Sequence, residues 1–139
     1  MKRGFEIYNK DIKSLKPTRQ TKCSAGYDFY LPTDIIIKPY EIIQIPSNVK
    51  AYMQDDEVLF LFIRSSMGIK NGLSLVNKVG VIDADYKDFE ISFTIRNNTD
   101  KVVNLSKDTR VVQGIFTKYL LSDDDHVETI RKGGIGSTK

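Results

Sequence analysis

The hydrophobic and polar positions of this chain follow short strand-like patterns, and helical periodicity is weak. Alternate residues from Phe89 to Ile95 are apolar and those between them are polar, which predicts a strand with one buried face. Residues 58–63 are apolar on both faces, which predicts a central strand of a layered β structure. Other strands are predicted at residues 4–8, 35–37, 42–45, 102–105 and 110–119, and only residues 65–70 favour a short helix.

Many short strands with few helices favour an all-β sandwich, jelly roll or barrel. The length of 139 residues fits one domain with a workable core. Residues 131–139 differ in kind, because they combine three glycines, two hydroxyl residues and three cations with one apolar residue. A segment of this composition cannot pack alone. We therefore expect a domain over residues 1–128 and a mobile arm over residues 129–139.

Composition narrows the classes of function. A single cysteine excludes an intrachain disulfide framework and a thiolate zinc cluster, and a single histidine argues against a Ser-His-Asp triad. A net charge of +3 is too small to indicate nucleic-acid binding. The chain shows neither a long apolar span nor an N-terminal signal pattern. We expect a soluble cytoplasmic protein that binds neither membranes nor nucleic acid.

One candidate catalytic group is a carboxylate at the end of an apolar run. Asp83 and Asp85 follow residues 79–82, which have the composition of a buried strand. Asp83 is either an exposed turn residue or a positioned general base whose pKa an apolar wall would raise. Tyr86 offers a ring face for packing, and Asn77 offers an amide for a polar ligand edge. The residues alone leave both interpretations of Asp83 open.

Three segments carry donors suited to an anion. Arg64, Ser65 and Ser66 lie between the central strand and the predicted helix, where they favour anion binding or, for the serines, helix capping. Gln113 either faces a ligand or pairs at a strand edge. The glycine-rich tail either holds phosphate through backbone N–H groups and cations or forms a disordered terminus.

Five segments of recognisable sequence follow one another along the chain: Ala25–Phe29, Arg64–Leu73, Asn77–Tyr86, Thr109–Gln113 and Gly133–Thr138. The third segment is fairly specific, and the ordered set spans nearly the whole chain. In this order they give the chain a resemblance to the trimeric, all-β family of dUTP diphosphatases (dUTPases). A related family, the dCTP deaminases, carries a further arginine soon after Arg-Ser-Ser, where this chain has Met67, and this difference argues against deamination.

The resemblance implies a jelly-roll-like β barrel that forms a homotrimer, with active sites between subunits and the arm closing over a neighbour's site. It implies hydrolysis of dUTP to dUMP and pyrophosphate by attack of water on the α-phosphorus. Mg²⁺ is the implied cofactor, chelated by the triphosphate without a direct protein ligand. Asp28 is expected to support the site through hydrogen bonds or a Mg²⁺-bound water.

The resemblance also implies roles for individual residues, with Asp83 as the general base. Tyr86 is expected to pack on the sugar and to exclude a ribose 2′-hydroxyl. The residues implied to hold uracil and deoxyribose are Asn77, Gly80, Val81, Ile82, Tyr86 and Ile135. Those implied to hold the phosphates are Arg64, Ser65, Ser66, Gln113, Arg131, Lys132, Gly134, Gly136, Ser137 and Thr138.

The chain departs from the family pattern in three places. Ile135 replaces a phenylalanine that stacks on uracil, and isoleucine cannot stack. Arg131 lies one residue nearer the double glycine than usual, so Lys132 is expected to share its contact with the γ-phosphate. Residues 86–90 replace the usual Tyr-Arg-Gly-Glu and predict a changed turn. These departures keep a second hypothesis open, a nucleotide-responsive regulatory protein that binds dUTP and a partner protein with little turnover.

Overall fold

The computed structural model of the protein describes residues 1–133. Within them the chain is mostly β structure, and every paired strand is antiparallel to its neighbour. Its elements are β1 (Gly4–Ile7), β2 (Tyr27–Tyr30), β3 (Ile35–Ile37), β4 (Ile42–Pro46), β5 (Val49–Tyr52), β6 (Glu57–Ile63), α1 (Ser65–Asn71), β7 (Leu73–Leu75), β8 (Gly80–Asp83), the 3₁₀ helix η1 (Ala84–Tyr86), β9 (Ser92–Asn97), β10 (Val103–Leu105) and β11 (Arg110–Lys118).

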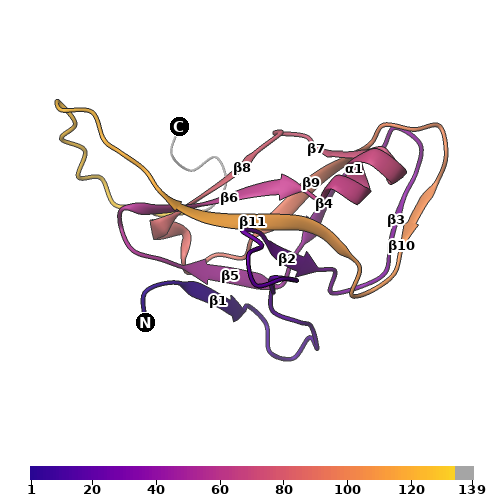
Figure 1. The fold of residues 1–139 in the computed structure, drawn as a ribbon, viewed down its shortest axis with the longest axis horizontal. Helices are drawn as coiled ribbons and strands as arrows, with labels where there is room; N and C mark the ends of the chain where they lie inside the picture. Colours follow the sequence, from indigo (N-terminus) through magenta and orange to yellow (C-terminus); the bar gives the residue numbers. More distant parts are fainter. Residues whose placement is uncertain (134–139) are drawn as a thin grey trace.

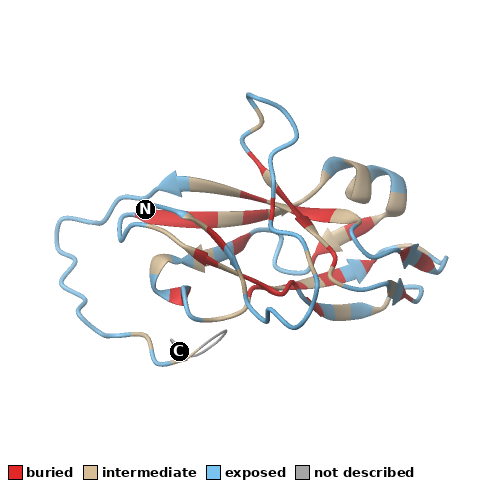
Figure 2. Ribbon diagram, turned by 90° about the horizontal axis from the view of Figure 1, so that it is seen from below, coloured by how far each residue is buried: buried red, intermediate tan, exposed pale blue. Residues whose placement is uncertain are grey.

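The strands form four small sheets around one apolar core, in the jelly-roll-like arrangement that the sequence predicts (Figure 1). A four-stranded sheet has the order β2-β11-β6-β8, and a three-stranded sheet has the order β4-β9-β7. Two ribbons, β1-β5 and β10-β3, complete the fold. Buried positions line the inner faces of the sheets, and Phe29 meets Phe93 edge to face at 5.3 Å between ring centroids (Figure 2).

Strand β6 forms the centre of the four-stranded sheet, as its uninterrupted apolar sequence predicts. It lies between β11 and β8, and its residues Leu59 and Leu61 are buried in the core. The alternate residues Phe60 and Phe62 are only partly buried, and their rings contact each other at 6.4 Å between centroids. Their face of β6 therefore remains partly open in the single chain.

The prediction that residues 79–82 form a buried strand is wrong. Strand β8 pairs only with β6 and forms an edge of its sheet. Only Gly80 is buried there, and Val81, opposite Phe60, is 57% exposed. Composition could not show this, because whether an apolar strand is covered depends on what packs on its outer face.

The short helix begins where the sequence places it, but it is not capped by a serine. The N-cap residue is Arg64, and it makes no side-chain cap hydrogen bond. The helix ends at Asn71, and its C-cap is Gly72, whose φ of 67° is the left-handed conformation that glycine adopts at little cost. No helix among residues 1–133 is long and apolar enough to cross a membrane.

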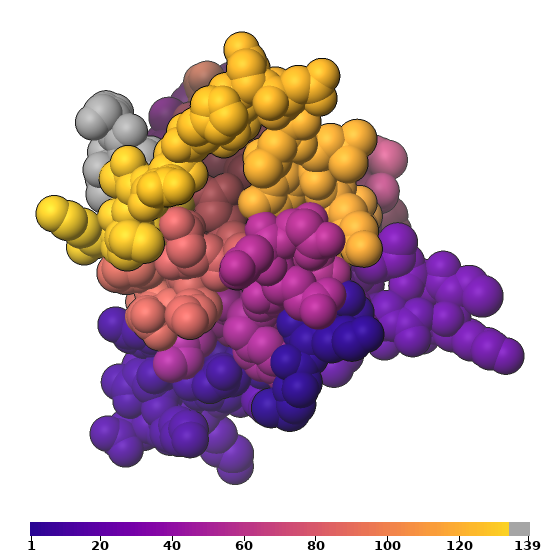
Figure 3. Space-filling model, turned by 90° about the vertical axis from the view of Figure 1, so that its left-hand side faces the viewer, coloured from indigo at the N-terminus to yellow at the C-terminus, as the bar shows by residue number. Residues whose placement is uncertain are grey.

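After β11 the chain leaves the barrel as an extended segment and returns to its surface. Residues 119–130 are all exposed, and Figure 2 shows them in pale blue, away from the sheets. Arg131 then comes back against the part of the chain around η1, and Figure 3 shows the yellow segment crossing this surface. We call residues 119–133 the described arm.

Candidate active site

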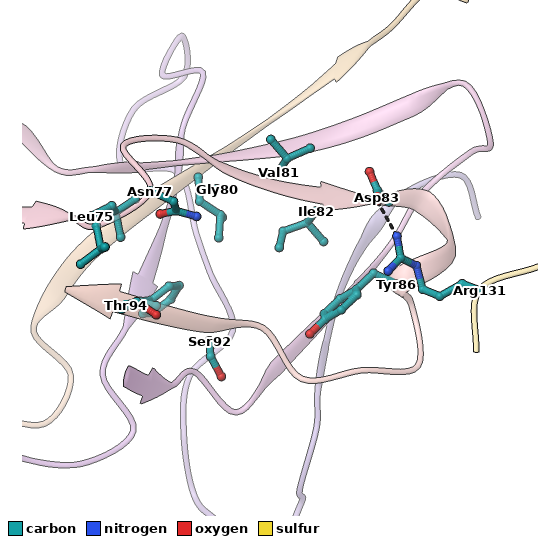
Figure 4. Close-up of a pocket in the computed structure, with 13 residues that line it drawn as sticks. Leu75, Asn77, Gly80, Val81, Ile82, Asp83, Tyr86, Ser92, Thr94 and Arg131 are labelled. Carbon is teal, nitrogen blue, oxygen red and sulfur yellow. Dashed lines mark hydrogen bonds and ion pairs between the residues drawn. The ribbon is translucent and has the colours of Figure 1, made fainter. Parts of the chain in front are cut away.

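A cavity of about 420 Å³ lies between the β7–β8 connection, strand β9 and the described arm. Figure 4 shows Asn77 at one end of it and Asp83, Tyr86 and Arg131 at the other. The structure therefore brings together almost all residues that the sequence assigns to uracil and deoxyribose. The predicted residues among those that line the cavity are Asn77, Gly80, Val81, Ile82, Asp83, Tyr86 and Arg131.

The cavity has a tight backbone wall on the β8 side. A side chain on Gly80 would place its Cβ 2.9 Å from Cβ of Leu61, so the two strands approach more closely here than a larger residue would allow. The polar residues Ser92 and Thr94 line the opposite side, on β9. Sequence analysis missed both, although the alternation along this strand marks them as the face away from the core.

Asp83 is the last residue of β8, at the end of the cavity where the arm returns. Its carboxylate is 52% exposed and makes no capping hydrogen bond to η1. Instead, Asp83 Oδ2 accepts a hydrogen bond from Arg131 Nη2 at 2.5 Å. The side chain is therefore accessible to water and faces a cation, which a plain turn residue would not require.

Tyr86 forms the floor beneath this cation. The guanidinium of Arg131 lies over its ring at 5.7 Å from the centroid, and Phe89 packs on the ring at 5.2 Å between centroids. The Tyr86 hydroxyl donates to the carbonyl of Glu90. Burial raises the pKa of Tyr86, the cation of Arg131 opposes this, and the charge of Glu90 adds to it.

The turn after Tyr86 has a simple local structure. The N–H of Phe89 donates to the carbonyl of Tyr86, and the carboxylate of Glu90 accepts from the N–H of Asn48 at 2.8 Å. These bonds fix the segment that the sequence expects to depart from the family pattern. The position of Tyr86 is thus supported from both the turn and the core.

The second group of predicted residues gathers around Asp28, on β2. Asp28 is only 5% exposed, and its two oxygens pair with Arg64 Nε and Arg110 Nη1, each at 3.3 Å. Arg64 Nη1 also donates to the carbonyl of Arg110 at 3.0 Å. A buried carboxylate held by two arginines orients both cations toward one region, which suits an anionic ligand. Sequence analysis did not single out Arg110.

Gln113 lies in the same cluster, in an interior strand. It pairs with Asp28 on β2 and with Phe62 on β6, so the interpretation as an edge residue is wrong. Its side chain extends over Gly26, where an added Cβ would come 2.1 Å from Gln113 Oε1. Ser65 and Ser66 begin α1 directly after Arg64. Four predicted phosphate ligands thus lie at one end of β6.

The two groups lie at opposite ends of β6. Asp83 pairs with Val58 near the start of this strand, and Arg64 follows its last residue. Val58 and Arg64 are six steps apart along the strand, which amounts to about 20 Å at roughly 3.3 Å per step. One chain therefore does not bring Asp83 to the Asp28 cluster.

Several predicted residues fall elsewhere. Lys132 is exposed beside Arg131. Among residues 1–133 no three His, Cys, Asp or Glu side chains gather in a way that could hold a metal ion. The arm residues Gly134, Ile135, Gly136, Ser137 and Thr138 lie outside the described residues.

Comparison with known proteins agrees with the resemblance seen in the sequence. The dUTPase family model matches residues 13–138. The deoxyuridine 5′-triphosphate nucleotidohydrolase of Lactococcus lactis subsp. lactis is 43% identical, over 98% of this chain and 97% of that protein.

Solved structures share the fold. The dUTPase of Streptococcus mutans is 44% identical, with a TM-score of 0.80 over 86% of this chain and 98% of that one. A mutant dUTPase of the Staphylococcus aureus phage phi11, described for its coordination of a structural Mg(II) ion, has a TM-score of 0.78 at 18% identity, over 95% of this chain and all of that one. The family match over most of the sequence and the two relatives above 40% identity show that the chain belongs to the dUTPase family.

Proposed function

We propose that the protein hydrolyses dUTP to dUMP and pyrophosphate, with Asp83 as the group that orients and deprotonates the attacking water. The observation that carries this proposal is the cavity that has Asn77 at one end and Asp83 beside Tyr86 at the other. A nucleoside fits along such a cavity with its base toward Asn77. The phosphates then leave at the end where Asp83 lies.

The reaction needs little covalent chemistry from the protein. Phosphoryl transfer depends on in-line placement of water and phosphorus and on neutralisation of charge. The carboxylate of Asp83 is accessible to water and extends from a paired strand, so its position is fixed by the β6–β8 ladder. General-base catalysis of this kind contributes about 10²- to 10⁴-fold to a rate.

Selectivity for deoxyuridine follows from the walls of the cavity. The close approach of Gly80 to Leu61 supports a backbone wall that has no room for the methyl group of thymine. The Asn77 amide and nearby backbone groups would leave cytosine with mismatched, unpaired polar groups. Tyr86 presents its ring at the sugar position, where it would exclude a ribose 2′-hydroxyl.

The Asp28 cluster is the proposed site for the phosphates, with Arg64, Ser65, Ser66 and Gln113 as donors. Both oxygens of Asp28 are engaged by arginines, so Asp28 suits an indirect contact with Mg²⁺ through water. This donor set fits an ion that arrives with the triphosphate, because Mg²⁺ retains waters and takes phosphate oxygens as ligands. Bound Mg²⁺ would neutralise part of the triphosphate charge.

The separation of the two groups along β6 supports a shared site. Reacting atoms must lie about 3–3.5 Å apart, so an Asp83 about 20 Å from Arg64 cannot serve the same phosphates within one chain. We propose a homotrimer in which one subunit supplies the cavity with Asp83 and another supplies the Asp28 cluster. The partly open apolar face of Phe60, Phe62 and Val81 is suited to such an interface.

Residues 1–128 and 129–139 remain our proposed division into barrel and arm, and a mobile arm that crosses to a neighbour stays a prediction. The arm's proposed role is to add Arg131, Lys132 and the glycine-rich residues to the phosphates. A cytoplasmic location also stays a prediction.

The first test is pyrophosphate release from dUTP with Mg²⁺, for the parent, for Asp83→Asn and for a chain ending at Glu128. We expect turnover of dUTP but not of dTTP, dCTP or UTP. Asp83→Asn should lose about 10²-fold or more of kcat, and the truncation should reduce activity. A parent that binds dUTP without releasing pyrophosphate would overturn the proposal and favour the regulatory hypothesis.

A further inference from the structure

The described arm returns to the barrel at one partly buried cation, Arg131. The Arg131 side chain is only 10% exposed, although every residue from 119 to 130 is exposed. It is held by two residues that lie more than 40 positions earlier in the chain. The contacts of Arg131 therefore decide where this segment meets the cavity.

The guanidinium of Arg131 donates hydrogen bonds to two carboxylates. Arg131 Nε donates to Asp85 Oδ1 at 2.6 Å, and Arg131 Nη2 donates to Asp83 Oδ2. The hydrogen bond that Arg131 donates to Asp85 is the main reason that the pKa of Arg131 is raised, and the charge of Asp83 adds less. The ring of Tyr86 supports the cation from its face.

Asp85 differs from Asp83 in where it lies. Asp83 lines both the nucleotide cavity and a neighbouring hollow, whereas Asp85 lines the hollow, with Asp55 and Tyr119, but not the cavity. The single turn of η1 separates the two side chains in this way. Asp85 therefore contacts the arm without bordering the space proposed for the nucleoside, and nothing in the catalytic scheme uses it.

We propose that Asp85 is a positioning residue that holds Arg131 by Nε at the mouth of the cavity. The inference rests on the proposed function, and in a trimer whose arm crosses to a neighbour the same Asp85–Arg131 pair would form between subunits. A guanidinium carries five N–H donors in a rigid fork, so the Nε bond leaves the Nη groups available. When a triphosphate enters, the Nη groups turn from Asp83 to its oxygens, the carboxylate of Asp83 becomes available to water, and the bond to Asp85 remains.

The contact between Asp85 and Arg131 anchors the arm, and it matters because residues 119–130 are all exposed. An exposed segment of a dozen residues loses conformational freedom when it closes over a site, and that loss weakens closure. A cation already fixed next to the phosphates reduces the freedom still to be lost when substrate binds. Asp85 should therefore act on the affinity for dUTP more than on the chemical step.

The test is a double-mutant cycle in the full chain between Asp85→Asn and Arg131→Gln. We expect Asp85→Asn to raise KM for dUTP about 3- to 10-fold with kcat within twofold, as fits one charge-assisted bond at a partly exposed site. In the presence of Arg131→Gln, the Asp85 substitution should have no further effect. Asp88→Asn is the matched control, because Asp88 is exposed and forms no ion pair with any described residue.

Three results would overturn the inference. They are an unchanged KM, effects of the two substitutions that simply add, and a fall in kcat with a shifted pH profile. The last would make Asp85 part of the chemical step. Partial recovery of KM in Asp85→Glu would support a positioning role, because the carboxylate is kept on a longer side chain.

A second measurement does not depend on turnover. A nitroxide label at Glu128→Cys, in a Cys23→Ser background, reports the mobility of the arm without nucleotide. Asp85→Asn should increase this mobility, and Asp88→Asn should not. If the parent fails to hydrolyse dUTP, the proposed function is wrong but the label still tests the anchor. Equal mobility of the label in the parent, Asp85→Asn and Asp88→Asn would contradict the proposal that Asp85 anchors the arm.

Discussion

The absence of a side chain at Gly26 helps to shape the cluster of residues around Asp28. Gly26 precedes β2, and the side chain of Gln113 occupies the space that a Cβ at position 26 would need. The β2–β11 register places Gln113 opposite Asp28, so the amide, the buried carboxylate and its two arginines share one surface. The glycine of the first family segment thus has a physical reason in this chain.

Replacing Gly26 with alanine should therefore impair substrate binding more than folding. The added methyl displaces the end of a flexible side chain, which lowers stability little but moves the amide away from the phosphates. We expect KM for dUTP to rise about tenfold, the effect of losing one hydrogen bond to a charged group. Steady-state kinetics beside thermal unfolding would check this. Gly68→Ala, where the new Cβ meets only ordinary contacts, is the control.

At the scale of elements, local pattern predicts some strands well and others not at all. β6 and β9 carry strong apolar patterns, although β9 begins at Ser92, later than the alternation suggests. The sequence analysis missed β2, β5 and β7, which have three or four residues each and depend on partners elsewhere in the chain.

In the candidate site, too, local sequence predicts some groupings of residues and not others. Asp83, Asn77 and Tyr86 lie within one segment, so their grouping follows from sequence. The contacts of Asp28 with Arg110 and of Asp85 with Arg131 join residues 82 and 46 positions apart, and no local pattern encodes them. Only the fold reveals these pairs.

The start of β6 should make stability depend on acid pH. Glu57 accepts from Arg3 Nε at 2.8 Å, and this bond, with that from the Gln54 N–H, lowers the pKa of Glu57. This interaction stabilises the fold at pH values above about 4.3, the pKa of a glutamate in the unfolded chain. The stabilisation is lost as the pH falls through the lower pKa that Glu57 has in the folded protein. Glu57→Gln should therefore lower Tm near neutral pH, and its difference from the parent should vanish in acid.

Thermal unfolding between about pH 3 and pH 7 measures this difference, since the range spans the ordinary pKa of a glutamate. Glu6→Gln removes an exposed carboxylate from β1 and serves as the control. A Tm difference that stays constant over the whole range would contradict the assignment to the Glu57 charge.

For the whole molecule, the proposed assembly rests on the length of β6. Its two ends carry different halves of the proposed site, and its outer face keeps Phe60 and Phe62 partly uncovered. Association would bury that face and bring the halves of different chains together. Both needs are met by one closed, symmetric oligomer.

Mixed oligomers should separate the two halves experimentally. Asp83→Asn chains and Arg64→Gln chains should each have low activity, and subunit exchange between them should restore part of it, because some sites then combine two intact halves. Mixing Asp83→Asn with Asn77→Ala should restore nothing, since both changes lie in the same half. Sedimentation should give three times the chain mass of 15.9 kDa. A fully active monomer would contradict the shared site.

The spacing along β6 also has a genetic consequence. In a cell that expresses two alleles, the proposed shared site would let a chain defective only at Asp83 supply its Asp28 cluster to a neighbour's reaction. The defect then behaves as a loss proportional to gene dosage, and two different defective alleles can complement each other. A substitution that disrupts the Phe60–Phe62 face would instead affect the assembly of every subunit that it joins. Alleles of this one gene should therefore fall into two classes of inheritance, those that change one half of the proposed site and those that change the Phe60–Phe62 face.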